Sequence, residues 1–160
     1  MDEHEAGGFL SREPEDVFQD PGQQGEAGGD AGQRTVLFAN VWDFVYRWLR
    51  HMYKRPTGPN MPLRWDSDWF RNPEVVSRLT ELWRVWEMAR VDDGSMMAIW
   101  WRDYCDPAMD RIMSPDGPFR TSDERTAPGQ PLGCNRPPAG QFIDERTGGP
   151  FRVPDDDSLA

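Results

Sequence analysis

All eight tryptophans of this 160-residue chain fall between Trp42 and Trp101. A large aromatic side chain covers roughly 150–250 Å² when it is buried, so this segment is where the chain can build a core. Residues 1–34 and 120–160 hold few large apolar side chains and much Gly, Pro, Asp and Glu, which is typical of disordered chain. The sequence therefore predicts one domain over residues 35–119, flanked by a disordered acidic tail, 1–34, and a disordered Pro/Gly-rich tail, 120–160.

The first half of the predicted domain reads as one helix and a turn. Apolar residues recur every three or four positions over residues 35–55, which predicts an amphipathic helix that ends before Pro56. Residues 56–62 contain three Pro and one Gly, so they predict a loop. Residues 65–70, Trp-Asp-Ser-Asp-Trp-Phe, predict a short turn whose aromatic side chains fold back onto the core.

The second half carries two further helical patterns. Asn72, Pro73 and Glu74 supply a cap, a first-turn proline and an acid at the positive end of the helix dipole, so a second helix starts here. In this helix Glu74 with Arg78, and Glu87 with Arg90, are spaced for surface ion pairs. A third apolar run, 95–113, predicts one kinked helix or two short helices that meet at residues 106–107, with a strand over 96–101 as the weaker alternative. We expect an all-α fold, a small three- to four-helix Trp-rich domain.

Aromatic pairs in a fixed order carry a family resemblance. The pattern is Trp65-x3-Trp69-x3-Pro73-Glu74-x3-Arg78-Leu79-x2-Leu82-Trp83-x2-Trp86-Glu87, followed by Trp100-Trp101-Arg102-Asp103, Asp106-Pro107 and Gly117-Pro118-Phe119. Over residues 38–119 it resembles a tryptophan-rich domain family of unknown function found in actinobacteria, their phages and their plasmids. The resemblance implies an origin in a mobile genetic element and implies no activity.

The same resemblance bears on metal binding. The family commonly has one Cys and three His at positions that suit zinc, and the corresponding residues here are Asp66, Asn72, Tyr104 and Ala108. The resemblance therefore implies that this chain has lost the site, and we expect no metal and no cofactor. A weaker alternative is a Mg²⁺ site built from acidic side chains near the third helix and the preceding turn, namely Asp103, Asp106 and Asp110 with Asp66 and Asp68.

Residues suited to catalysis are scarce. The chain has two histidines, His4 in the acidic tail and His51 among basic residues, and it lacks a Gly-rich phosphate loop and a Gly-x-Ser-x-Gly elbow. Cys105 and Cys134 have no neighbouring Cys or His, so we expect reduced, inert thiols, with a disulfide or a metal role as weaker alternatives. The sequence favours a protein that is not an enzyme.

A short basic face on the first helix is one candidate binding surface. Arg47, Arg50 and Lys54 lie opposite its apolar stripe. The chain carries a net charge of −10, but residues 35–119 hold twelve acids against eleven bases, so the face stands on a nearly neutral domain. The face is either solvated surface or a docking surface for a phosphate backbone or an acidic partner.

Two repeated peptides in the C-terminal segment are the other candidate. Gly-Pro-Phe-Arg at 117–120 recurs at 149–152, and Asp-Glu-Arg-Thr at 123–126 recurs at 144–147. Two similar peptides on a flexible tail bind one receptor with a raised effective concentration, which makes Phe119, Arg120, Phe151 and Arg152 candidate partner-binding residues. Chance in a biased composition, or a neutral duplication, is the simpler explanation of the repeats.

These observations favour an interaction or accessory protein of a phage or plasmid, whose tails present linear motifs to an unidentified protein partner. The alternative is an accessory nucleic-acid-binding protein that uses the basic face of the first helix. The chain has no run of about 18 apolar residues, and its first residues, Met-Asp-Glu-His-Glu, do not start a signal peptide. We therefore expect a cytoplasmic protein that does not contact a membrane.

Overall fold

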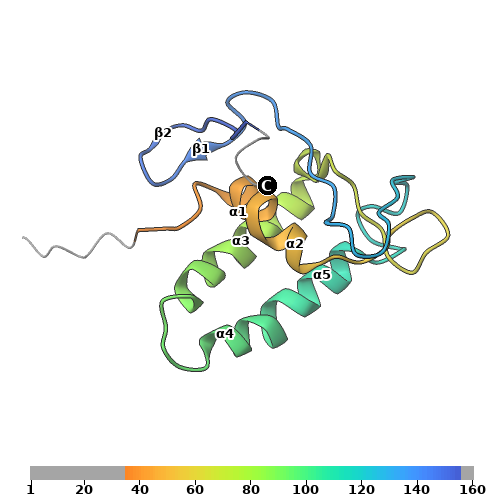
Figure 1. Cartoon of the computed structure of the whole chain (residues 1–160), viewed down its shortest axis with the longest axis horizontal. Helices are drawn as coiled ribbons and strands as arrows, with labels where there is room; N and C mark the ends of the chain where they lie inside the picture. The colour runs from red at the N-terminus through yellow and green to blue at the C-terminus, as the bar shows by residue number, and fades with distance from the viewer. Residues whose placement is uncertain (1–34, 156–160) are drawn as a thin grey trace, which may run out of the picture. The chain divides into compact units, whose positions relative to one another are not determined.

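A computed structural model describes residues 35–155. The predicted tail at 1–34 and the last five residues, 156–160, lie outside the described residues. The described part is mainly helical, as predicted, and adds one small hairpin (Figure 1). Its α-helices are α1 (Val41–Phe44), α2 (Arg50–Met52), α3 (Pro73–Ala89), α4 (Met96–Ile99) and α5 (Asp106–Ile112). Two π-helical segments, η1 (Val45–Leu49) and η3 (Trp100–Cys105), a 3₁₀ turn, η2 (Trp69–Arg71), and the strands β1 (Ile143–Asp144) and β2 (Gly149–Pro150) complete it.

The first helical run, α1–η1–α2, begins later than its apolar pattern predicts. The Asn40 side chain accepts a hydrogen bond from the Asp43 N–H at 3.0 Å, and the Asp43 carboxylate accepts one from the Ala39 N–H at 2.9 Å. These reciprocal bonds cap the helix at Asn40, whose backbone is extended. Residues 35–39 are therefore free to run along α3 instead of joining the helix.

Helix α3 forms as its start signal predicts. The Asn72 side chain accepts from the Val75 N–H at 3.2 Å, and Pro73 stands in the first turn. The predicted apolar face is buried, with Leu79 and Trp83 almost fully enclosed. The turn before it is also confirmed, because Trp65, Trp69 and Phe70 are all buried.

The third apolar run is one helical run, α4–η3–α5, that changes its hydrogen-bond register. Its middle part is the π segment η3, and Pro107 stands in the first turn of α5, so the strand alternative for residues 96–101 is wrong. The π register comes just before the proline, which supplies no N–H to the ladder. Trp48 of η1 contacts Trp100 and Trp101 of η3, with ring centroids 5.7 and 5.8 Å apart, so the two π segments meet through their tryptophans.

The expected disorder of the C-terminal segment is corrected by the structure over residues 120–155. Three tryptophan indole N–H groups hold three consecutive residues, 133–135. Trp65 donates to the Gly133 carbonyl at 2.7 Å, Trp69 to the Cys134 sulfur at 3.4 Å and Trp42 to the Asn135 carbonyl at 3.0 Å. Leu132 is completely buried beside them. An indole N–H that is buried leaves water and gains from an acceptor in the protein, and this strap, residues 132–135, supplies the acceptors for Trp42, Trp65 and Trp69.

The hairpin of β1 and β2 is fixed to the start of the first helical run. The Glu145 N–H donates to the Ala39 carbonyl at 2.8 Å, and the Asn40 side-chain amide donates to the Ile143 carbonyl at 2.9 Å. These bonds bring Glu145 next to the C-terminal half of α3. Within residues 35–155, no helix has the length and apolar content that a bilayer span needs.

Candidate functional site

The site begins with a buried carboxylate on α3. Both Glu87 oxygens accept from the Leu37 N–H, at 2.9 and 3.0 Å, and further bonds come from the Phe38 N–H at 3.0 Å, the Trp83 indole at 3.1 Å and Arg90 Nε at 2.6 Å. Burial works to raise the pKa of Glu87, but the hydrogen bonds outweigh it and lower that pKa below its ordinary value. Glu87 therefore stays ionised and ties residues 37–38 to α3.

Arg90 makes a second connection between α3 and the residues that precede the first helical run. Its Nη2 donates to the Thr35 carbonyl at 2.7 Å while its Nε donates to Glu87. One guanidinium therefore joins the end of α3 to residues 35–39, which we call the 35–39 segment. The sequence interpretation of Glu87 and Arg90 as a surface pair is wrong, because Glu87 is buried. The matching prediction for Glu74 and Arg78 is confirmed, since that pair is exposed at 3.0 Å.

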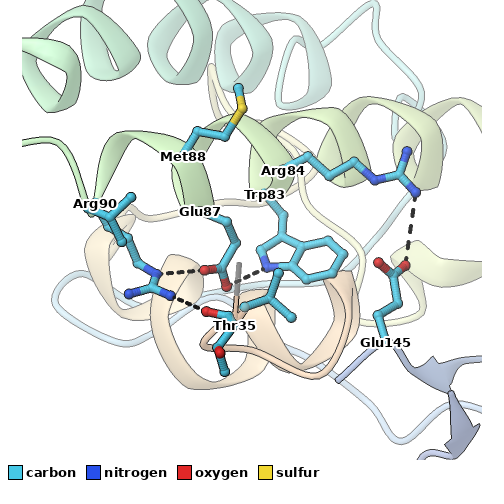
Figure 2. Close-up of a pocket in the computed structure, with 9 residues that line it drawn as sticks. Thr35, Trp83, Arg84, Glu87, Met88, Arg90 and Glu145 are labelled. Atoms are coloured by element: carbon cyan, nitrogen blue, oxygen red, sulfur yellow. Dashed lines mark hydrogen bonds and ion pairs between the residues drawn. The ribbon is translucent and has the colours of Figure 1, made fainter. Parts of the chain in front are cut away.

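A pocket of about 470 Å³ lies between the 35–39 segment, α3 and the hairpin (Figure 2). We call it the α3 pocket. Its apolar lining comes from Val36, Trp83, Met88 and Val91. Figure 2 shows the Glu87–Arg90 pair at one end and, at the other, Arg84 facing Glu145.

The Arg84 end is built differently from the Glu87 end. Arg84 lies 3.9 Å from the Glu145 carboxylate and 3.3 Å from that of Glu81. The side chains of Arg84 and Glu145 are 55% and 36% exposed, so water reaches this pair. Every charged side chain that lines the pocket thus has an opposite charge from this chain beside it.

Two exposed apolar side chains line the α3 pocket. Among the described residues six large hydrophobic side chains are exposed, and two of them, Met88 and Val91, line the pocket. Their exposed fractions are 47% and 61%. Exposed apolar side chains beside a hollow with an apolar lining are typical of a surface that contacts another molecule.

Comparison with known protein families finds a match, which covers most of the described residues. Residues 38–138 match a family model described as a domain of unknown function, DUF4913. The chain belongs to this family. The DUF4913 match starts where the resemblance in the aromatic pattern starts and continues past residue 119, so it takes in the strap. No curated protein and no solved structure matches the chain.

The DUF4913 boundaries divide the α3 pocket. Its α3 residues lie inside the match, whereas Thr35, Val36 and Glu145 lie outside it. The family domain thus supplies the helical side of the pocket. Flanking segments of this chain supply the opposite wall.

The basic face predicted on the first helix is largely engaged within the chain. Arg47 lies 3.6 Å from the buried Asp43 carboxylate. The Arg50 guanidinium lies 4.6 Å from the centre of the Tyr46 ring, and its carbonyl accepts from the N–H of Leu132 in the strap. Lys54 is exposed. Arg47 and Arg50 thus have partners within the chain, and the side chains of Arg47 and Lys54 still reach solvent.

The repeated peptides do not present their aromatic residues as free motifs. Phe119 is buried edge-on against Trp65, with ring centroids 5.5 Å apart, and Phe151 is half-buried at 5.9 Å from Trp42. Arg120 and Arg152 are exposed. The two copies also differ in structure, because the first lies in turns after α5 and the second contains β2. The two copies therefore do not present equivalent surfaces within the described residues.

The acidic residues weighed for Mg²⁺ are not gathered into one site. Among residues 35–155 no group of three or more His, Cys, Asp or Glu is placed to hold a metal ion. Asp103 bonds Arg102 at 2.7 Å, and Asp106 accepts from the Tyr53 hydroxyl at 2.7 Å. The positions that the resemblance linked to zinc line two different hollows, Asp66 and Asn72 in one and Tyr104 and Ala108 in the other.

Both cysteines are free thiols in hydrogen-bonded surroundings. Burial raises the pKa of Cys105 to about 12 and that of Cys134 to about 11. The reactive form of a thiol is its thiolate, which these values disfavour at neutral pH. The surroundings of the two thiols agree with the expectation that they are unreactive.

Sequence reasoning did not find the α3 pocket. One signal for it was present, because Glu87 follows Trp83 by four residues and so falls on the apolar face of α3. An acid on an apolar face must find donors when it is buried. The other residues, Val36, Met88 and Glu145, carry no local signal, since only the tertiary fold brings them together.

Proposed function

We propose that this chain is a non-enzymatic interaction domain, and that its α3 pocket binds an uncharged apolar segment of a partner protein. The observation that carries the proposal is an apolar lining, with Met88 and Val91 exposed, in a pocket whose charges are already paired. Apolar surface gains from being covered, whereas a charged ligand group finds no unpaired counter-ion among the pocket's lining residues.

An interaction role fits the polar groups of the pocket better than catalysis does. A general acid or base needs a free lone pair or proton within reach of a substrate. The Glu87 oxygens already accept hydrogen bonds from the backbone of the 35–39 segment and from the side chains of Trp83 and Arg90. This carboxylate therefore stabilises the fold. The apolar lining is the part of the pocket that remains available to a ligand.

We place the protein among the accessory proteins of a phage or plasmid, on the strength of the aromatic pattern and its resemblance. Nucleic-acid binding by the first helix has less support. Arg47 and Arg50 are held by Asp43 and Tyr46, and a face of so few cations on a nearly neutral domain gives only weak, salt-sensitive binding.

Site-specific photo-cross-linking in the cells that make the protein tests the proposal. A photoreactive phenylalanine analogue replaces Met88 in the full chain, and a second variant carries it at Met52, which lies outside the pocket. The two methionines are matched, with exposed fractions of 47% and 49%. We expect a discrete cross-linked product from position 88 and none of the same mass from position 52, identified by mass spectrometry.

The partner segment should be apolar at the cross-linked residue. A second substitution, Val91→Asp, should abolish the product because it places an unpaired charge in the pocket. Equal products from both positions, or none from position 88, would contradict the proposal. A cross-link between two copies of this chain would show that the pocket binds a second copy of the chain and would contradict a separate partner protein.

A further inference from the structure

The exposed pair of Arg84 and Glu145, at one end of the α3 pocket, bears on which ligands the pocket accepts. This inference rests on the proposed function and concerns Glu145, which lies on the hairpin outside the family match. Its backbone is fixed by the bond from its N–H to the Ala39 carbonyl. Its side chain is the part of the hairpin that lines the pocket.

Arg84 would make the pocket attractive to anions if it stood alone. It lies on the pocket wall, its side chain is 55% exposed, and guanidinium groups bind carboxylates and other oxyanions well. Glu81 pairs with it at 3.3 Å from one turn earlier on α3 and does not line the pocket. Glu145 is therefore the carboxylate that meets Arg84 from the pocket side.

The opposite end of the pocket needs no such partner. Arg90 is held by Glu87 at 2.6 Å and by the Thr35 carbonyl at 2.7 Å. The Glu87 charge is in turn compensated by Arg90 and by two backbone N–H groups. Arg84 is thus the lining cation that has an exposed acidic side chain, Glu145, as its partner on the pocket side.

We infer that Glu145 is a specificity-determining residue, which excludes anionic groups from the α3 pocket and reserves it for uncharged apolar segments. Its carboxylate neutralises Arg84 from within the pocket and repels a second negative charge there. Selection against the wrong ligand by a like charge is a common way in which a binding site gains specificity.

Two fluorescent probes with the same ring system test the inference on the full chain. N-phenyl-1-naphthylamine is uncharged, and 8-anilino-1-naphthalenesulfonate carries one negative charge. Wild type should bind the uncharged probe more tightly. Glu145→Gln should raise the affinity for the sulfonate, relative to that for the uncharged probe, about two- to fivefold, the range expected for one exposed ion pair.

Glu74→Gln is the matched control, because Glu74 is also an exposed acid paired with an arginine, at 3.0 Å, and does not line the α3 pocket. It should change neither affinity. Adding Arg84→Gln to Glu145→Gln should remove the gain for the sulfonate. An unchanged sulfonate affinity in Glu145→Gln, relative to that for the uncharged probe, would overturn the role of Glu145.

The pocket itself is tested separately in the same titrations. Met88→Gln should weaken binding of the uncharged probe, while Met52→Gln should not. If Glu145→Gln has no effect but Met88→Gln weakens binding, the specificity role fails and the proposed binding site stands. If Met88→Gln has no effect, the binding site fails as well.

Discussion

The two ends of the α3 pocket carry the same pair of residue types in opposite settings. At one end the Glu87 side chain is 6% exposed and lies 2.6 Å from Arg90. At the other the Glu145 side chain is 36% exposed and lies 3.9 Å from Arg84. The first pair holds the backbone of residues 35–38 against α3, and the second joins α3 to the hairpin at the solvent-exposed end of the pocket. Under the proposed function, one chemistry serves folding where it is buried and recognition where it is exposed.

The physical basis of the difference is solvent. A buried carboxylate that loses its donors leaves them unpaired in a poorly solvated site, which is costly. An exposed pair that breaks is rehydrated, and the loss is typically below about 1 kcal/mol. The Glu145–Arg84 pair is therefore easily opened by a change of ligand, whereas the Glu87–Arg90 pair is not.

The largest expected effect is the loss of the buried charge. Glu87→Gln should lower the free energy of unfolding by about 2–4 kcal/mol, because the neutral amide cannot accept as many strong bonds from Leu37, Phe38 and Arg90. Glu145→Gln should change it by about 0.5 kcal/mol or less. Urea denaturation followed by tryptophan fluorescence measures both. Similar losses for the two variants would break the comparison.

The same contrast should appear as a smaller effect in the pH dependence of stability. The folded state lowers the pKa of Glu87 below its ordinary value of 4.5, so the unfolded chain takes up a proton at this residue more readily. The contribution of Glu87 is fully present above that pH and is lost as the pH falls below it, through the lowered pKa. Urea midpoints between pH 7 and pH 3 should fall more steeply for wild type than for Glu87→Gln. Parallel curves would show that Glu87 is not the titrating anchor.

Local chemistry explains which parts of the fold the sequence predicts. The cap at Asn72, the apolar face of α3 and the buried aromatics of residues 65–70 depend on neighbours within a few positions, and all three are confirmed. The helical class follows from the same spacing. Local sequence signals are enough to predict these features, because their partners lie close together in the sequence.

The features that the sequence did not predict depend on long-range pairing. Composition marked residues 120–155 as disordered, yet Trp42, Trp65 and Trp69 find their acceptors in the strap. Glu87 resembles a surface acid by its spacing to Arg90. Its burial follows from the segment 37–38, some fifty residues away in the chain. Hydrogen bonds to buried polar groups contribute in both cases, together with the burial of Leu132 in the strap.

The most direct measurement of the central claim follows the methyl groups of the methionines by NMR while N-phenyl-1-naphthylamine is added to the full chain. The chain has eight methionines, and loss of one signal in Met88→Gln and of another in Met52→Gln assigns the two equally exposed methyls. If the α3 pocket takes up an uncharged apolar group, the Met88 methyl should shift in a saturable way through the ring current of the probe, while the Met52 methyl stays in place. A Met88 signal that does not move, or equal shifts of both methyls, would contradict the account.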